Sequence, residues 1–198
     1  MTITYPIGDA LYINITNLCQ NSCEFCVRNH QESVGGSDSL WLEHEPSLQE
    51  VLDDLLGKDL NTYKELVFCG FGEPTQRLEL LLETAKAVKA KYDIPIRINT
   101  NGLADLSQGE HTAPKLKGLI DSVSISLNAS TPEKYDAICH SEFGLQALPA
   151  VLEFTKSAVQ NIPSVTMSVV DAIPPEEIEA CRKLCEQTGA QFRVRSFF

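Results

Sequence analysis

Short apolar runs alternate along this chain with longer stretches in which apolar residues recur every three or four positions. The short runs are typical of buried strands, and the longer stretches are typical of helices with one apolar face. The sequence predicts strands at residues 11–16, 65–70, 94–99, 122–127, 164–170 and 191–195. It predicts helices at residues 46–56, 78–92, 114–119, 131–139, 145–159 and 174–188.

Each predicted strand except the last is followed by a helix, and no tandem hairpins interrupt the order. This alternation is typical of a parallel sheet joined by right-handed crossovers. A closed eight-stranded barrel needs about 250 residues, whereas this chain has 198. We therefore expect one α/β domain over residues 1–198, built as a partial (β/α)6 TIM-like barrel with a parallel six-stranded sheet. A flat doubly wound sheet is the structural alternative.

The net charge, the N-terminal residues and the length of the apolar stretches limit the partners and the location that we expect for this protein. The formal net charge is −11 and the isoelectric point is near 4.8, so a nucleic acid is not an expected partner. Residues 1–6 lack the basic start of a signal peptide, and no apolar stretch approaches the ~20 residues of a membrane span. We expect no membrane association and a reducing, cytoplasmic location, with a surface loop at residues 30–43.

Three of the seven cysteines lie together, directly after the first predicted strand. Cys19, Cys23 and Cys26 have the spacing C-x3-C-x2-C, which favours a thiophilic metal centre. An iron–sulfur cluster held by only three thiolates would keep one iron open for another ligand. His30 lies four residues beyond Cys26, so a closed Cys3His zinc site in a non-catalytic module is the alternative.

A second unusual stretch, GFGEP at residues 70–74, follows the second strand. Glycines let a backbone approach a ligand without a Cβ in the way, and a nearby carboxylate can hold an ammonium group. Taken alone, the stretch could equally be a plain turn. Other polar residues end the third, fourth and fifth strands. In parallel α/β folds these strand ends meet at one edge of the sheet, where sites form.

Together and in this order, the cysteine motif with Phe25 before its last cysteine and the GFGEP stretch resemble the radical S-adenosylmethionine (SAM) superfamily. The resemblance implies a [4Fe–4S] cluster on the three cysteines and SAM on the open iron. It also implies reductive cleavage of SAM to a 5′-deoxyadenosyl radical that abstracts hydrogen from a substrate. An enzyme of this kind is the expected function, with no side chain needed as a general base.

The resemblance also implies which residues contact SAM. These residues are Phe25, Gly70, Gly72, Glu73, Pro74, Asn99, Asn101, Ser126, Asn128 and Val170. Turn formation alone would explain Asn101 equally well, because Asn-Gly is a turn pair. Arg195, near the end of the last strand, is a candidate ligand for a substrate anion, with a surface ion pair as its alternative.

We expect the remaining four cysteines to pack as small apolar side chains in the protein core. Cys69 lies in a buried strand, and Cys139 ends a helix. Cys181 and Cys185 lie four residues apart on one helix face, so a second metal site is their alternative.

Within the superfamily, residues 126–136 are similar to the TatD-associated radical SAM proteins. That resemblance implies a pathway link to a TatD-type hydrolase, while the superfamily resemblance implies an electron donor such as flavodoxin or ferredoxin. The substrate, a small molecule or a protein, is not indicated by the sequence.

Overall fold

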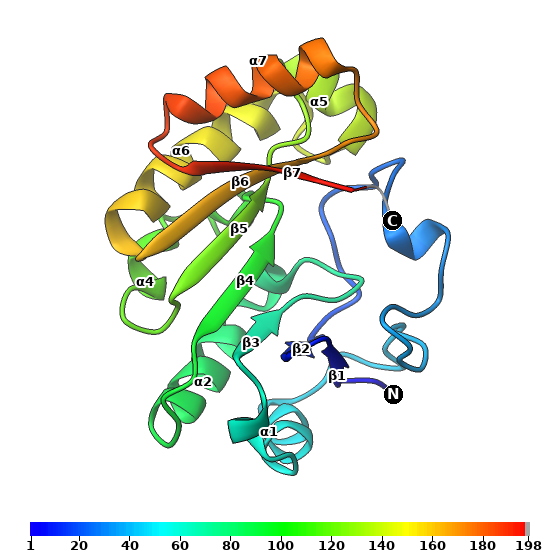
Figure 1. The fold of residues 1–198 in the computed structure, drawn as a ribbon, viewed down its shortest axis with the longest axis vertical. Helices are drawn as coiled ribbons and strands as arrows, with labels where there is room; N and C mark the ends of the chain where they lie inside the picture. The colour runs from blue at the N-terminus through cyan, green and yellow to red at the C-terminus, as the bar shows by residue number, and fades with distance from the viewer. Residues whose placement is uncertain (197–198) are drawn as a thin grey trace.

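Six parallel strands, each ending in a polar loop, form most of one sheet in the computed structural model, which describes residues 1–196. The strands lie side by side in chain order (Figure 1). The sheet as a whole consists of seven strands: β1 (Thr4–Ile7), β2 (Ala10–Ile13), β3 (Glu65–Phe68), β4 (Ile96–Thr100), β5 (Ser122–Ser126), β6 (Ser164–Val170) and β7 (Gln191–Arg195). The parallel pairing from β2 to β7 confirms the predicted α/β class.

The prediction of six strands was wrong, because the sheet has a seventh. Strand β1 pairs antiparallel with β2 through a two-residue turn at Gly8 and Asp9. Gly8 has a φ of 59°, a conformation that glycine adopts at little cost in such turns. The signal was present in the sequence as Gly-Asp between two short apolar runs, and it implies a hairpin.

The barrel prediction is not confirmed. Strands β1 and β7 are the two ends of the sheet, and within residues 1–196 no strand pairing joins them. The sheet is therefore open, with β7 as one edge.

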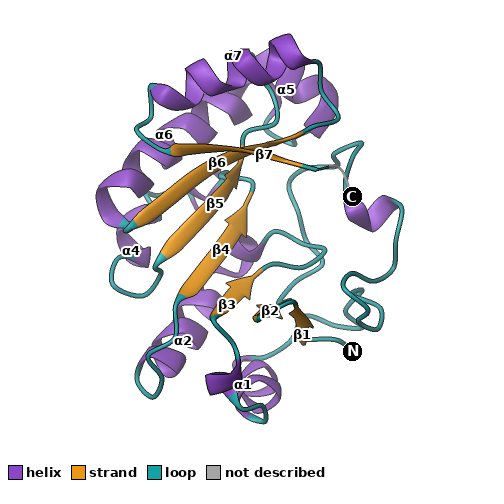
Figure 2. Ribbon diagram, viewed as in Figure 1, coloured by secondary structure: helices purple, strands orange, loops and turns teal. Residues whose placement is uncertain are grey.

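The helices pack mainly against one side of the sheet. They are α1 (Leu48–Leu56), α2 (Leu78–Lys89), α3 (Ala104–Gln108), α4 (Ala113–Leu116), α5 (Pro132–Cys139), α6 (Ala147–Asn161) and α7 (Pro175–Glu186). Six of them match predicted helices, and the short α3 was not predicted. Figure 2 shows α2, α4, α6 and α7 along one side, and the long loop from β2 to α1 on the other. Among the described residues, no helix has the length and apolar character that crossing a membrane requires.

Strand alternation separates an apolar side of the sheet from a polar one. Side chains such as Leu66, Ile98 and Ile125 are fully buried under the helices. The side chains of the residues next to them along each strand point to the opposite side of the sheet, which we call the inner face. The inner face carries mostly polar side chains, from Tyr12, Arg97, Asn99, Ser124, Ser126, Ser168, Arg193 and Arg195.

The loop predicted at residues 30–43 is present, but it is not wholly superficial. Leu40 is 1% exposed and packs with Tyr5 and Phe71 in a second, smaller apolar cluster. Trp41 contacts the edge of the Phe71 ring, with 5.1 Å between ring centres. These contacts hold the loop beside the hairpin formed by β1 and β2.

Helix α1 begins with a capping box that fixes where the long loop ends. The Ser47 hydroxyl accepts a hydrogen bond from the Glu50 amide, and the Glu50 carboxylate accepts one from the Ser47 amide.

Ser47→Ala should lower the free energy of unfolding by about 1 kcal/mol, because the amides at the start of the helix lose an acceptor. Chemical denaturation measures this. Ser157→Ala, within α6, is the control, and an equal loss there would contradict the capping role.

Candidate functional site

The three cysteines of the C-x3-C-x2-C motif lie in the loop that follows β2, and each is half-buried. The Arg28 side chain, which belongs to the same loop, stabilises it. Its guanidinium donates hydrogen bonds to the backbone carbonyls of Asn17, Asn21 and Phe71, at 3.3–3.5 Å. The loop is therefore tied to itself and to the segment after β3 by one positively charged side chain close to the thiols.

The surroundings of the cysteines favour neutral thiols in the metal-free protein. Burial raises the pKa of Cys19 to about 12, and the nearby Glu73 carboxylate adds to the rise. The pKa of Cys23 is raised by a hydrogen bond with Cys139 and by burial, and that of Cys26 by burial. Arg28 opposes all three shifts. A metal centre here would have to displace protons from the thiols as it binds.

The zinc alternative gains no support from this conformation. Within residues 1–196, no three Cys, His, Asp or Glu side chains converge on a position that could hold a single metal ion. A [4Fe–4S] cluster makes a different demand, because it binds each thiolate through a different iron and so spaces the sulfurs around a larger body.

The GFGEP stretch packs directly against the start of the cysteine loop. A Cβ on Gly72 would lie 2.3 Å from the Thr16 carbonyl oxygen and 2.7 Å from that of Leu18. A Cβ on Gly70 would lie 2.0 Å from the side-chain oxygen of Asn14. Glycine at position 72 therefore allows a close approach of two backbone segments that any other residue would block, and glycine at position 70 leaves room for the Asn14 side chain.

The Glu73 carboxylate joins this stretch to the end of β4. It is buried and accepts hydrogen bonds from the Thr75 amide and hydroxyl, the Thr100 hydroxyl and the Asn101 amide, at 2.7–3.1 Å. Burial raises the pKa of Glu73, whereas these donors favour the ionised form. The prediction that Glu73 contacts SAM stays a prediction, and its visible role is to hold two loops together.

Asn101 brings the end of β4 to the cysteine loop. Its side-chain nitrogen donates to the Gln20 side-chain oxygen at 3.0 Å and lies 3.9 Å from the Cys19 sulfur. The predicted meeting of the first three strand ends is thus present in the structure. Asn99 lies lower on the inner face, where its side-chain oxygen accepts a hydrogen bond from Arg97 at 2.7 Å.

The end of β5 reaches the cysteine loop through α5. Asn128, in a left-handed conformation with φ of 59°, places its side-chain nitrogen 3.8 Å from the Cys139 sulfur. Cys139 is buried beside Cys23, and its carbonyl accepts a hydrogen bond from the Ser22 amide at 2.9 Å. Sequence reasoning assigned Cys139 to packing and missed this contact, because no spacing rule links positions so far apart in the chain.

The other predicted residues take varied positions. Phe25 is half-buried against the main apolar core, and Pro74 is buried at the start of a short 3₁₀ turn. Ser126 and Val170 end β5 and β6 on the inner face, and Val170 pairs with Arg195 in the sheet.

Cys181 and Cys185 are buried in α7. The Cys185 sulfur lies 3.5 Å from the Ala190 and Gln191 carbonyl oxygens. Both positions are as expected for packing, the role that the sequence predicted for them.

Several buried polar atoms around the cysteine loop have no hydrogen-bond partner within residues 1–196. They are the side-chain nitrogen of Gln20 and the side-chain oxygens of Asn21 and Asn128. Buried polar groups normally have partners, so their occurrence together indicates a place where a polar ligand would bind. Three thiols beside unpaired amide groups fit a cofactor that combines a soft metal centre with a polar organic part.

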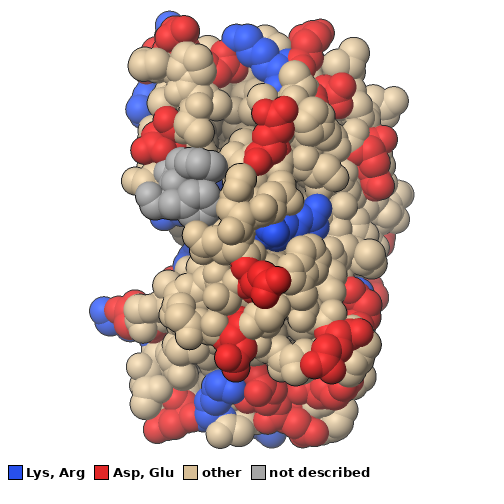
Figure 3. Space-filling model, turned by 90° about the vertical axis from the view of Figure 1, so that its right-hand side faces the viewer, with Lys and Arg blue, Asp and Glu red and all other residues tan. Residues whose placement is uncertain are grey.

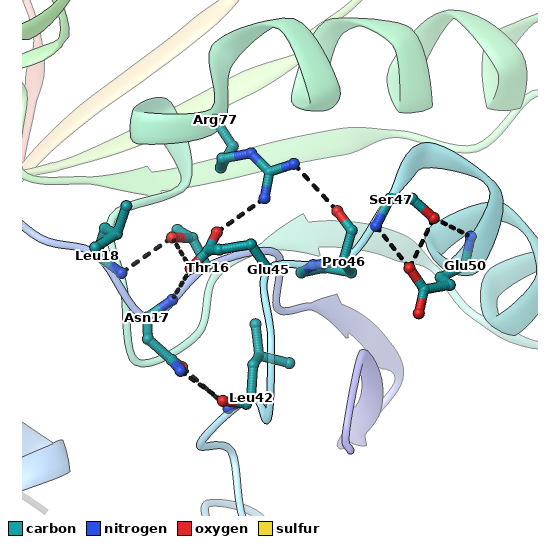
Figure 4. Close-up of polar contacts among 9 residues, drawn as sticks. All are labelled: Thr16, Asn17, Leu18, Leu42, Glu45, Pro46, Ser47, Glu50 and Arg77. Carbon is teal, nitrogen blue, oxygen red and sulfur yellow. Dashed lines mark hydrogen bonds and ion pairs between the residues drawn. The ribbon is translucent and has the colours of Figure 1, made fainter.

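Sequence reasoning also missed Glu45, which fixes the start of the cysteine loop (Figure 4). One carboxylate oxygen accepts hydrogen bonds from the Thr16 hydroxyl at 3.0 Å and the Asn17 amide at 3.2 Å. The other pairs with Arg77 at 2.8 Å, and Arg77 also donates to the Pro46 carbonyl. No local signal marks Glu45 in the sequence, because all these partners except Pro46 are distant in the chain.

The fold and the site together define the class of protein. It is an α/β protein in which a loop with three cysteines, spaced as in a metal-binding motif, lies at the carboxyl ends of the parallel strands. The family model of the radical SAM superfamily matches residues 13–186. The chain belongs to the radical SAM superfamily. This confirms the predicted superfamily, whose members use SAM and a [4Fe–4S] cluster as cofactors.

Solved structures show the same fold. A radical SAM methyltransferase from Sphaerobacter thermophilus matches with a TM-score of 0.69 and 15% identity, over 98% of this chain and 57% of that one. SuiB of Streptococcus suis, solved with S-adenosylmethionine, matches with a TM-score of 0.69 and 16% identity, over 97% of this chain and 40% of that one. The structure of anSMEcpe with bound AdoMet matches with a TM-score of 0.65 and 16% identity, over 98% of this chain and 52% of that one.

The chain thus spans about half the length of these solved structures. A comparison with curated proteins found no match.

The contact between the two motifs can be tested at Gly72. Gly72→Ala should lower the free energy of unfolding by at least about 2 kcal/mol, because the new methyl group would overlap two backbone oxygens. It should also lower the iron bound per chain after anaerobic reconstitution. The control is Gly57→Ala, at a helix end where a Cβ would lie 3.0 Å from the Asp53 carbonyl oxygen. Equal effects of the two substitutions would contradict a special role for Gly72.

Glu45 allows a second test. Glu45→Ala leaves the Thr16 hydroxyl and the Asn17 amide without an acceptor, which should cost about 1–3 kcal/mol of stability. The loosened loop should let a thiol reagent modify Cys19 faster in the metal-free protein, as followed by mass spectrometry. Glu43→Ala is the control, since Glu43 is exposed and makes a surface ion pair with the N-terminus at 3.5 Å. Unchanged labelling of Cys19 in Glu45→Ala would rule out this positioning role.

Proposed function

We propose that this chain is a radical SAM enzyme that cleaves SAM reductively and abstracts hydrogen from a substrate. When bound, the reduced cluster and SAM supply the electron and the 5′-deoxyadenosyl radical for this chemistry. The observation that carries the proposal is the convergence of the cysteine loop, the GFGEP stretch and the end of β4 within a matched radical SAM domain.

The proposed metal ligands are Cys19, Cys23 and Cys26. Their thiols lie on one loop, which Arg28 and the contacts with Gly72 hold in place. The positive charge of Arg28 favours the thiolate forms that bind iron.

The proposed SAM site lies beside the cysteine loop, at the carboxyl ends of β3 to β6. The backbone of the GFGEP stretch would contact the methionine part of SAM, and the Glu73 carboxylate would hold that backbone in position through Thr75, Thr100 and Asn101. The unpaired oxygen of Asn128 and the unpaired nitrogen of Gln20 would gain partners. The other proposed contacts are Phe25, Asn99, Asn101, Ser126 and Val170.

The finer assignments are also proposals. Residues 126–136, which resemble the TatD-associated radical SAM proteins, support that subfamily and a pathway link to a TatD-type hydrolase. The electron donor would be a flavodoxin or ferredoxin, and the location would be the cytoplasm, where free thiols persist. Arg195 is the proposed contact for the substrate.

Removing one cysteine tests the proposal. Protein purified without oxygen should absorb broadly at about 400 nm, and its reduced form should give an electron paramagnetic resonance signal that changes when SAM is added. Cys19→Ala should lose that change and the production of 5′-deoxyadenosine from SAM. His30→Ala is the control, and it should keep both. A colourless protein that holds one zinc ion, and loses it in His30→Ala, would overturn the proposal in favour of the zinc module.

A further inference from the structure

The inner face of the sheet carries three arginines, and two of them have no acidic partner in the described part of the chain. Arg97 on β4 makes two hydrogen bonds with the Glu65 carboxylate, at 2.7 and 3.1 Å. Arg193 and Arg195 on β7 instead donate to serine hydroxyls. Arg193 lies 3.5 Å from the Ser124 oxygen, and Arg195 lies 3.1 Å from the Ser168 oxygen. Within residues 1–196 neither of these two guanidiniums forms an ion pair.

Two neighbouring cations on one face repel each other. Arg193 and Arg195 are two residues apart on a strand, so their side chains project to the same side. Arg193 and Arg195 are both exposed as residues. The protein atoms around the Arg195 guanidinium nonetheless lower its pKa, and the charge of Arg193 lowers it further. An anion between the two would remove this repulsion, because each positive charge would gain a negative neighbour.

This pair is unusual in a protein with a formal net charge of −11. Figure 3 shows acidic side chains spread over much of the molecular face on the side of the long loop. Two unpaired arginines on the inner face are therefore a local reversal of the protein's overall charge. Such a reversal is typical of a place that attracts and holds an anion.

The pair also lies near the proposed cofactor site. Arg97 and Arg195 both act electrostatically on the Cys69 thiol, which directly precedes the GFGEP stretch. Arg195, at the end of β7, is therefore within electrostatic range of the residue that follows β3. Arg195 also pairs with Val170, one of the proposed SAM contacts. A ligand held by the two arginines would lie beside the place where the radical would form.

We propose that Arg193 and Arg195 bind an anionic group of the substrate, a carboxylate or a phosphate, with the Ser124 and Ser168 hydroxyls at its edge. This inference rests on the proposed function, because it takes the inner face as the substrate site. A guanidinium presents a planar pair of N–H donors that matches two oxygens of a carboxylate or phosphate. The substrate is then a molecule that carries one of these groups on the part held against β7.

Anion binding to the reconstituted, anaerobic protein tests the inference. The probes are inorganic phosphate and malonate, and isothermal titration calorimetry measures their affinities in the presence of SAM. Arg193→Gln and Arg195→Gln should each weaken the better probe by about tenfold, since each removes a charge-assisted hydrogen bond. A preference for phosphate or for malonate identifies which anionic group the substrate carries. Arg182→Gln, whose guanidinium lies over the Phe192 ring at 4.7 Å, is the matched control.

Three results would overturn the inference. One is that neither probe binds the wild-type protein, and another is that both variants bind as tightly as wild type. The third is that Arg195→Gln loses the spectroscopic response to SAM and keeps anion binding, because the guanidinium would then serve SAM. Titrating the Cys19→Ala variant separates this inference from the proposed function. Anion binding that persists there without a cluster would support the anion site even if the radical chemistry failed.

Discussion

Close contact between two backbone segments is the constraint on which the candidate site depends. The carbonyl oxygens of Thr16 and Leu18 occupy the space that a side chain on Gly72 would need, and the Glu73 amide donates to Leu18 at 2.7 Å. The buried Glu73 carboxylate then continues the connection to the end of β4 at Asn101. Three loops from three strands therefore hold one another, and none takes its position independently.

The cysteine loop is also held from its other side, by helix α5. Backbone hydrogen bonds join Ser22 and Glu24 to the last residues of that helix, and Cys139 lies against Cys23. Contact with Cys139 and partial burial raise the pKa of the Cys23 thiol, and partial burial raises the pKa of the other two thiols, while the positive charge of Arg28 opposes each rise. Metal binding and proton release are coupled in such a site.

Charge is distributed unevenly between the surface and the inner face. The chain is strongly acidic overall, yet the inner face presents Arg193 and Arg195 next to serine hydroxyls. Because β7 is an edge of an open sheet, these side chains border the side at which a substrate could enter. The proposed cofactor site and the proposed anion site therefore use different elements, the strand ends for one and the last strand for the other.

The sequence by itself determined the α/β order, most element positions and the two motifs, because strand and helix periodicities and short-range spacing are local properties. It also predicted that the loops after the strands meet at one edge, which follows from parallel pairing. Only the tertiary structure decided that β1 adds a seventh strand and that the sheet stays open. The contacts of Glu45 with the cysteine loop, of Cys139 with Cys23 and of Arg193 with Ser124 are likewise visible only there. These depend on contacts between positions far apart in the chain, which local patterns do not encode.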